Sequence, residues 1–307
     1  MSTRTRLGRL AGVVGVASAA AALPHAHASA QDAKRCSISV GVVTPDGRQG
    51  SATFTATQPV TSTPPRFDAG PVFAPGVARL ASDAIIEPVV PADAETRGSV
   101  VLGDSLYTYA YRYQPKPPSG LTFTRIGSGW GAMKALSIVQ YSPLNATEAT
   151  SHHRTYALAS DGTLNRWEVR AGGYAAKESA PGFSSVRAMA HNSQTTTYDT
   201  FLVTTNGGAL YTVRIPLARP MKPVVKVVRT SGWAAHESLV ADGCGRQGTL
   251  VAGIDRDTGT VRLYAVGHAT GTTTPIVDLG VAPTKLTGSP TYLSTVAPFA
   301  RSPLFGE

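Results

Sequence analysis

The sequence is poor in the residues from which metal and redox sites are built. It has 307 residues but only 2 cysteines, Cys36 and Cys244, and 7 histidines. There is no CxxC pair and no group of cysteine and histidine at zinc-ligand spacing. The loop from Asp255 to Gly259 has too few carboxylates for a calcium site. We therefore expect no metal and no other cofactor.

The signatures of several enzyme classes are absent as well. The sequence contains no GxSxG, no HExxH and no glycine-rich phosphate loop. Its 28 Lys and Arg outnumber its 19 Asp and Glu, so the formal net charge is +9. These basic residues are scattered and form no run of the kind that binds nucleic acid. We therefore expect no nucleic-acid partner, and we predict no catalytic residue.

Long hydrophobic runs are absent after the first part of the chain. A basic start is followed by an apolar segment at residues 10–23, and Ala28 and Ala30 supply the small residues that a signal peptidase requires. The apolar segment is too short to span a membrane. We predict that residues 1–30 are a secretory signal peptide. Residues 31–307 are then expected to form a single secreted, extracellular domain without membrane insertion.

Glycine and proline, by contrast, are abundant, with 31 and 22 residues. A phrase of glycine followed by a bulky residue returns at intervals of about fifty residues, which is typical of solenoids, propellers and arrays. Its copies are Pro75-Gly76-Val77, Ser128-Gly129-Trp130, Pro181-Gly182-Phe183, Ser231-Gly232-Trp233 and Leu279-Gly280-Val281.

Each repeat has the content of four short strands. In the second copy, a β-like segment over Met133–Tyr141 is followed by the apolar run Thr155–Ala159, the turn Asp161-Gly162 and a third segment from Leu164. Aspartate or asparagine with glycine favours a tight hairpin, because such turns need positive φ angles. Four antiparallel strands in about fifty residues are the content of one propeller blade.

The two ends of the repeat region determine the number of blades. After Val281 there is room for one strand only, and before Val77 there are strands but no innermost one. If both ends share one sheet, no open edge remains. We predict an all-β, five-bladed β-propeller of four-stranded antiparallel blades, closed by a composite blade from both termini. The composite blade takes residues 36–73 and a last innermost strand at 281–294, and the continuous blades lie at about 77–127, 130–180, 183–230 and 233–279.

The two cysteines have places in this arrangement. Cys36 stands at the start of the second strand of the composite blade, and Cys244 lies in the loop after the first strand of the preceding blade. Both positions fall on the same face of adjacent blades. Because paired cysteines in an oxidising compartment are more often bridged than free, we predict a Cys36–Cys244 disulfide.

One stretch of the sequence resembles a known repeat. Residues 125–134, read as Arg-Ile-Gly-Ser-Gly-Trp-Gly-Ala-Met-Lys, with Asp161-Gly162-Thr163-Leu164 downstream, are similar to the tachylectin-type repeat. The resemblance extends over residues 36–294, and the tryptophan of the repeat is replaced in three copies. It implies a five-bladed lectin-like propeller that binds N-acetylated or other neutral sugars at several weak sites. The partners would be surface glycans or glycoproteins, and we expect a monomer.

The repeat also predicts where sugar would bind. The loop that carries the aromatic residue and the Asp/Asn–Gly turn lie on the same face of the propeller. An aromatic wall beside a carboxylate or amide suits a sugar ring, although such aromatics often pack between blades and such turns often form only hairpins. The predicted carbohydrate-binding residues are Trp130, Asp161, Phe183, Asn206, Trp233 and Asp255.

Two other functions are compatible with the same sequence. A propeller can serve as a protein-interaction platform without sugar binding. It can also be a glycoside hydrolase, for which the innermost strands offer Asp83, Glu237 and Asp242, although only as isolated residues. The balance of features favours a binding protein over an enzyme. A formal glycosylation sequon begins at Asn145.

Overall fold

The structure is a computed structural model. It describes residues 36–68, 70–82, 84–89, 93–113, 118–143, 147, 150–171, 173–288, 291–296 and 306–307. The predicted signal peptide, the sequon at Asn145 and the candidate carboxylate Asp83 lie outside the described residues. Within these ranges, no helix is long and apolar enough to cross a membrane.

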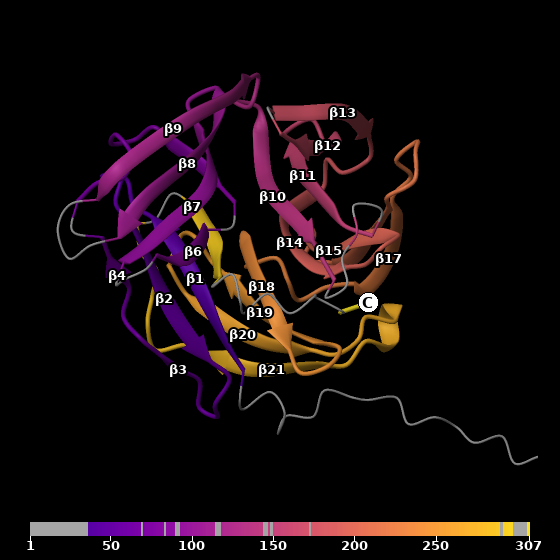
Figure 1. Cartoon of the computed structure of the whole chain (residues 1–307). Coiled ribbons are helices and arrows are strands. Elements are labelled where there is room, and N and C mark those ends of the chain that lie inside the picture. The colour runs from indigo at the N-terminus through magenta and orange to yellow at the C-terminus, as the bar shows by residue number, and fades with distance from the viewer. Residues whose placement is uncertain are drawn as a thin grey trace, which may run out of the picture.

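Five four-stranded antiparallel blades form a ring, so the predicted propeller is confirmed (Figure 1). Three blades are separate sheets, each built from consecutive strands. Blade 2 contains β10 (Met133–Tyr141), β11 (His152–Ala159), β12 (Leu164–Arg170) and β13 (Gly173–Ala180). Blade 3 contains β14 (Val186–Gln194), β15 (Tyr198–Thr205), β16 (Leu210–Pro216) and β17 (Val224–Arg229). Blade 4 contains β18 (Ser238–Cys244), β19 (Gly248–Ile254), β20 (Val261–Val266) and β21 (Ile276–Val281).

Blade 1 and the composite blade are joined into one larger sheet. Blade 1 has an innermost strand in two parts, β5 (Ala78–Ala81) and β6 (Ala84–Val89), followed by β7 (Asp93–Leu102), β8 (Ser105–Tyr113) and β9 (Ser119–Ser128). The composite blade has β22 (Thr291–Val296) innermost, then β1 (Ser37–Val43), β2 (Gln49–Thr55) and an outer edge of the short β3 (Thr61–Ser62) and β4 (Arg66–Phe67).

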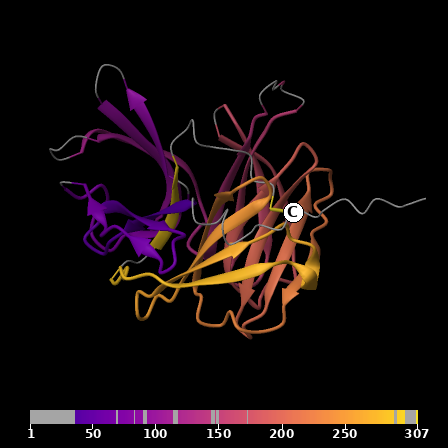
Figure 2. The same cartoon turned by 90° about the horizontal axis from the view of Figure 1, so that it is seen from below.

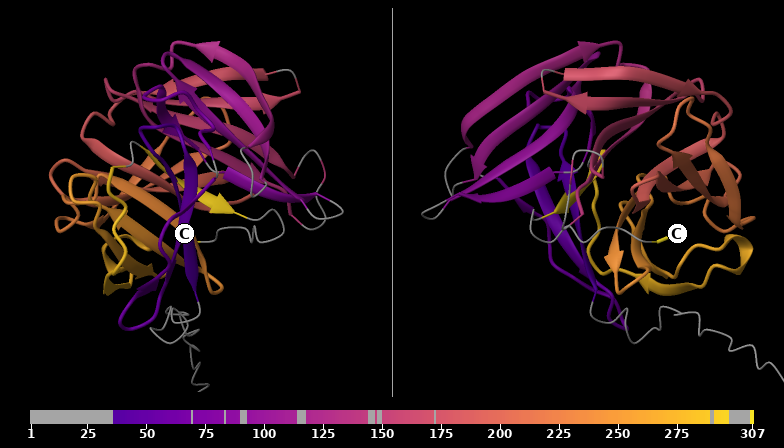
Figure 3. Two further views of the ribbon diagram at one scale, coloured as in Figure 1. Left: turned by 90° about the vertical axis from the view of Figure 1, so that its left-hand side faces the viewer. Right: turned by 45° about the vertical axis from the view of Figure 1, so that its right-hand side comes forward.

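The two ends of the chain close the ring as predicted. The C-terminal β22 pairs antiparallel with β1, with Val42 opposite Tyr292, and Figure 2 shows this yellow strand among the indigo N-terminal strands. At its far end β22 also pairs in parallel with β6. The innermost strands therefore follow one another around the axis in the order β5, β10, β14, β18 and β22, which returns to β5 (Figure 3, right).

The core lies between neighbouring blades. Side chains of successive strand residues point to opposite faces, and both faces of a blade are covered by its neighbours. This is why β19, in the middle of blade 4, is buried along its whole length. Between blade 4 and the composite blade, Leu250 and Leu263 pack in one cluster with Ile38. Burial on both sides accounts for the apolar runs seen in the second strand of each repeat.

One backbone hydrogen bond is repeated at every junction, and we call these bonds the blade latches. In each, the turn between the second and third strands of one blade accepts from an N–H at the entry to the next blade. The five pairs are Trp130 N to Asp104 O at 3.0 Å, Phe183 N to Gly162 O at 2.9 Å, Trp233 N to Gly208 O at 2.9 Å, Leu286 N to Gly259 O at 2.8 Å and Phe73 N to Gly47 O at 3.0 Å.

The latches correct the interpretation of the two weaker repeat copies. Val77 and Val281 follow the repeated glycine but are 37% and 49% exposed. At these two junctions Phe73 and Leu286 donate the latch bond instead, and both are buried. In the last copy Gly280 lies inside β21, next to a register shift, so the phrase ends an outer strand. The innermost strand accordingly begins at Thr291, later than the predicted start at 281.

The turn glycines are required by this geometry. Gly162 has a φ of +87°, and a Cβ there would lie 2.2 Å from the backbone nitrogen of Ser184. Only glycine allows the turn of one blade to approach the entry of the next this closely. The predicted Asp161-Gly162 hairpin turn is thus confirmed, and it has a second role as the latch acceptor.

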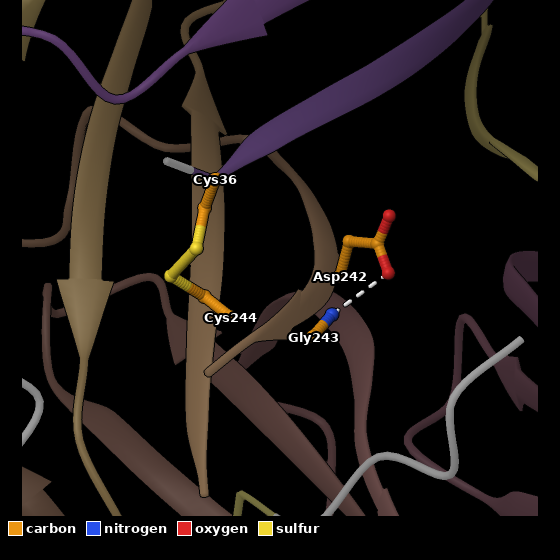
Figure 4. The surroundings of a disulfide bond; sticks show 4 residues. All are labelled: Cys36, Asp242, Gly243 and Cys244. Atoms are coloured by element: carbon orange, nitrogen blue, oxygen red, sulfur yellow. Dashed lines mark hydrogen bonds between the residues drawn. A yellow bond between two sulfur atoms is a disulfide. The ribbon is translucent and has the colours of Figure 1, made fainter. Parts of the chain in front are cut away.

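The predicted disulfide is present between Cys36 and Cys244 (Figure 4). The two Cα atoms are 5.6 Å apart, although the residues are separated by 208 positions in the sequence. Cys244 is the last residue of β18 and does not lie in the following loop, as was predicted. Innermost strands begin on the face of the ring that carries the latches, so β18 ends, at Cys244, on the other face. The disulfide therefore joins blade 4 to the composite blade on that other face. We call the face with the latches the turn face and the other one the opposite face.

Candidate functional site

The three predicted aromatic residues are buried in the junctions between blades. Trp130, Phe183 and Trp233 are only 6%, 8% and 4% exposed. The ring of Trp130 lies 4.8 Å from that of Trp167, and the ring of Trp233 lies 4.4 Å from that of Tyr264. Rings packed in this way offer no open face to a ligand, so their burial favours the packing interpretation. A direct role of these rings in sugar binding stays a prediction.

The three predicted polar residues lie in the turns beside the latches. Asp161 Oδ1 accepts a hydrogen bond from the N–H of Thr163 at 2.8 Å, and this bond lowers the pKa of the Asp161 carboxyl. Asp255 Oδ1 accepts from two backbone N–H groups of its own turn, each at 3.0 Å. The N–H of Asn206 donates to the carbonyl of Ser185 in the same blade. The structure thus brings turns and aromatic residues together at the turn face, with the carboxylates of Asp161 and Asp255 bonded within their own turns.

The carboxylates considered for hydrolysis do not form a pair among the described residues. Glu237 precedes β18 and Asp242 lies within it, so they are five residue steps apart, or about 17 Å along an extended chain. Paired carboxylates of glycoside hydrolases are roughly 5–10 Å apart. Glu237 is also paired with Arg187 of blade 3.

Glu237 belongs to a small acidic cluster on the turn face. Its carboxylate oxygen and those of Asp255 and Asp257 lie within 4.8 Å of one another. Arg187 donates to Glu237 Oε1, and the backbone N–H of Arg256 donates to Oε2 at 3.0 Å. Both carboxylate oxygens of Glu237 therefore already accept hydrogen bonds, one of them from a cation. The expectation that no metal binds here stays a prediction.

A central channel runs between the five innermost strands. Its cavity has a volume of about 110 Å³ and is lined in part by the polar side chains of Ser82, Ser137 and Gln194. Sites for small organic ligands are usually about 300 Å³ or larger. The channel itself is therefore too narrow for a sugar, although it opens at the turn face into a mouth of about 450 Å³ lined in part by the charged side chains of Lys134, Arg187 and Glu237.

A larger groove of about 310 Å³ lies in the junction between blades 1 and 2. Its blade 1 wall comes from β7, β8 and β9, and its blade 2 wall comes from strand ends near the opposite face. Hydroxyl groups, two guanidinium groups and one aromatic ring share this surface. The side chains that carry them are Ser99, Thr108, Thr124, Arg125, Arg170 and Tyr174.

The aromatic wall of the groove is held in place from behind. The ring of Tyr174 stands edge-on to that of Trp130 at 6.1 Å. Burial raises the pKa of the Tyr174 phenol, which therefore stays neutral at physiological pH. Trp130, predicted as a sugar contact, thus supports the residue that lines the groove.

The cations of the groove are positioned by neighbours on their own blades. Arg125 Nε donates to Ser105 Oγ at 3.2 Å, and Arg170 pairs with Glu168 at 2.6 Å. Arg125 opens the segment that resembles the tachylectin-type repeat but was not predicted as a sugar contact, and Arg170 lies in no motif. The segment that holds Arg125 and Trp130 is the sequence signal that could have pointed to this junction.

No family model matches the chain, and no curated protein sequence does either. Among solved structures, the chain is similar to an arginine-to-alanine mutant of AofleA from Arthrobotrys oligospora, with 10% identity, a TM-score of 0.42 and coverage of 86% of this chain and 78% of that one. It is also similar to the Hadza microbial sialidase Hz136, with 11% identity, a TM-score of 0.35 and coverage of 81% and 60%. These distant similarities do not confirm the tachylectin-type resemblance, which stays a prediction.

Proposed function

We propose that this protein is a secreted carbohydrate-binding propeller whose binding site is the groove between blades 1 and 2. The observation that carries the proposal is the composition of this groove, about 310 Å³ in volume, with hydroxyl, guanidinium and aromatic groups on facing walls. Small-molecule sites combine apolar walls with a few converging polar groups. The groove also has the necessary size, whereas the central channel itself is too narrow.

The chemistry of the groove matches that of a sugar ring. The exposed hydroxyl of Thr124 can both donate and accept, as sugar hydroxyls do. Arg125 supplies only donors and would bind oxygen atoms. Tyr174 offers a ring for C–H groups, and its neutral phenol adds a polar contact.

The proposal places the protein outside the cell. The Cys36–Cys244 disulfide is typical of an oxidising compartment. Surface glycans or glycoproteins are then the natural partners. Because the lining residues belong to one junction, we propose one such groove in each ring, with avidity requiring several copies of the protein on one surface.

A glycan array with protein comprising residues 31–307 tests the proposal. We expect binding that falls about tenfold or more in Arg125→Ala, since a hydrogen bond to a charged donor contributes about 1.5–3 kcal/mol. Arg112→Ala is the matched control, because Arg112 is also an exposed arginine of blade 1 but does not line the groove. An array without binding, or equal binding by Arg125→Ala and the native protein, would remove the proposal.

A protein-interaction role is the second candidate, and a different observation favours it. Val224 and Val225 are 47% and 50% exposed on β17, the outer strand of blade 3. An exposed apolar edge strand can pair with a partner chain. Recovery of a cell-surface partner that persists after enzymatic removal of glycans would support this role.

A further inference from the structure

Residues 306 and 307 lie between blades 3 and 4, where Figure 1 marks the C end of the chain. We call the place that they occupy the slot. The N–H of Gly306 donates to the carbonyl of Asn192 in blade 3 at 3.2 Å. The N–H of Ala269, in the loop after β20 of blade 4, donates to the carbonyl of Gly306 at 2.7 Å. Both blades therefore hold the main chain of this segment.

The slot holds an acidic side chain. The Glu307 side chain is 2% exposed, and its Oε1 lies 2.9 Å from Arg214 Nη2 and 4.0 Å from Lys226 Nζ. Arg214 is itself oriented by the ring of Tyr198, whose centroid lies 4.3 Å from the guanidinium carbon. The Tyr198 hydroxyl donates to the Glu307 carbonyl at 3.2 Å. A buried carboxylate is thus matched by a guanidinium with a fixed orientation.

The slot also selects the residue before the glutamate. A Cβ at position 306 would lie 2.6 Å from both Asn192 Oδ1 and Thr249 Oγ1. These two atoms are joined by a hydrogen bond of 2.9 Å, so neither is free to move aside. The geometry accepts glycine followed by an acidic residue and excludes a side chain at the first position.

The present occupant leaves polar capacity in the slot unused. Asn192 Nδ2, Arg214 Nε and Glu307 Oε2 are buried, and none has a hydrogen-bond partner among the described residues. Buried polar groups are normally satisfied, because leaving one unpaired costs about 1–3 kcal/mol. Two of these atoms belong to the slot and the third to its occupant, so the chain's own residues leave polar groups of the slot unsatisfied.

The slot is specific to this junction and is no general feature of the repeat. When the third strands are aligned on the turns that precede them, Arg214 occupies a place that no other blade fills with a cation. The residues at this place in the other blades are Ala110, Glu168, Ala265 and Thr53.

We propose that the slot between blades 3 and 4 is a binding site for a protein segment in which glycine precedes an acidic residue, and that residues 306–307 occupy it in cis. A partner that carries such a segment binds when the chain's own residues leave. The inference is independent of sugar binding in the groove between blades 1 and 2.

The test measures fluorescence anisotropy of a labelled peptide with the sequence of residues 304–307. Gly306→Ala in the full chain should empty the slot, because the added methyl group does not fit. We expect the peptide to bind this variant at least tenfold more tightly than the native chain. Adding Arg214→Met to Gly306→Ala should abolish the gain, whereas adding Arg112→Met should leave it intact.

The peptide itself supplies further controls. Alanine in place of its glycine, or glutamine in place of its glutamate, should weaken binding at least tenfold. If Gly306→Ala does not fold, Glu307→Gln in the full chain provides the same comparison with a smaller expected gain. Equal peptide binding by the native and emptied chains would overturn the proposal. Displacement of the peptide by glucuronic acid but not by unlabelled peptide would overturn it in favour of an acidic sugar.

Discussion

The two faces of this propeller differ in how their blade junctions are built. At the turn face, all five junctions carry the same backbone latch. At the opposite face, each junction among the described residues is built in a different way. The features that differ are the groove between blades 1 and 2, the Asp199 carboxylate bound to His152 and Tyr156 between blades 2 and 3, the Gly306–Glu307 segment, the disulfide, and the β22–β6 pairing.

This difference separates the scaffold from the candidate sites. Each latch joins a turn of one blade to a buried apolar residue at the entry to the next, and the repeated phrase marks that residue at three of the five junctions. Ligand capacity lies where the junctions depart from the repeat, in the open groove and in the filled slot. The most periodic residues are therefore expected to determine stability, and the irregular ones to determine binding.

The largest expected effect comes from a connection on the opposite face. Replacing Cys36 and Cys244 together by serine removes a bond that closes a loop of 208 residues. The chain-entropy model gives a loss of about 5.4 kcal/mol for a loop of this length. Guanidinium chloride unfolding measures it. Unfolding of the double variant at the same midpoint as the native protein would show that the pairing β22–β1 closes the ring without help.

A latch residue should come next. Trp130→Ala removes a buried ring, which costs about 3–5 kcal/mol in the free energy of unfolding. Because Tyr174 rests on this ring, sugar binding should fall as well, in parallel with stability. A loss of binding with an unchanged melting temperature would instead make Trp130 a direct sugar contact.

Two turn glycines allow a matched comparison. Gly162→Ala should cost about 2–3 kcal/mol, because the new methyl group meets the Ser184 backbone and the φ is positive. Gly103→Ala has a positive φ of +58° but open space around it, so it should cost about 1 kcal/mol. Thermal unfolding of both variants gives the difference. Equal losses would mean that the close approach at the latch contributes nothing.

The smallest expected effect is a pH dependence of stability caused by His236, which lies next to the latch residue Trp233 at the entry to blade 4. Burial, together with the charge of Arg262, lowers the pKa of His236 below its ordinary value of 6.5. The unfolded chain then binds the proton at a higher pH than the folded one, so stability is fully present above about pH 6.5 and falls as the pH decreases below it. The native protein should lose more stability between pH 7.5 and 5 than His236→Gln, as measured by urea unfolding. Parallel losses would exclude His236 as the cause.

Much of the fold could be predicted from the sequence because its signals are local. The strand at Met133–Tyr141 has the predicted bounds, since alternation and Asp–Gly turns act within a few residues. The last innermost strand was placed too early, because Gly280 matches the repeated phrase while Leu286 takes its structural place. Ring closure nevertheless followed from counting strands at the two ends.

The candidate sites could not be predicted in this way. Thr124, Arg170 and Tyr174 come from different strands of two blades and meet only through packing. No linear spacing relates them. The slot for Glu307 depends on Arg214, which is one arginine among many in the sequence. The aromatic residues Trp130, Phe183 and Trp233 were predicted as contacts because they repeat, and they repeat because a buried apolar residue packs at each latch.

The most direct test of this separation is a paired titration of the best glycan from the array against Arg125→Ala and Gly162→Ala, with melting temperatures measured on the same samples. We expect Arg125→Ala to lose about tenfold or more in affinity with little change in melting temperature. We expect Gly162→Ala to melt several degrees lower and to bind like the native protein. The reverse pattern, with binding lost in Gly162→Ala and kept in Arg125→Ala, would contradict this separation and place the sugar site at the turn face.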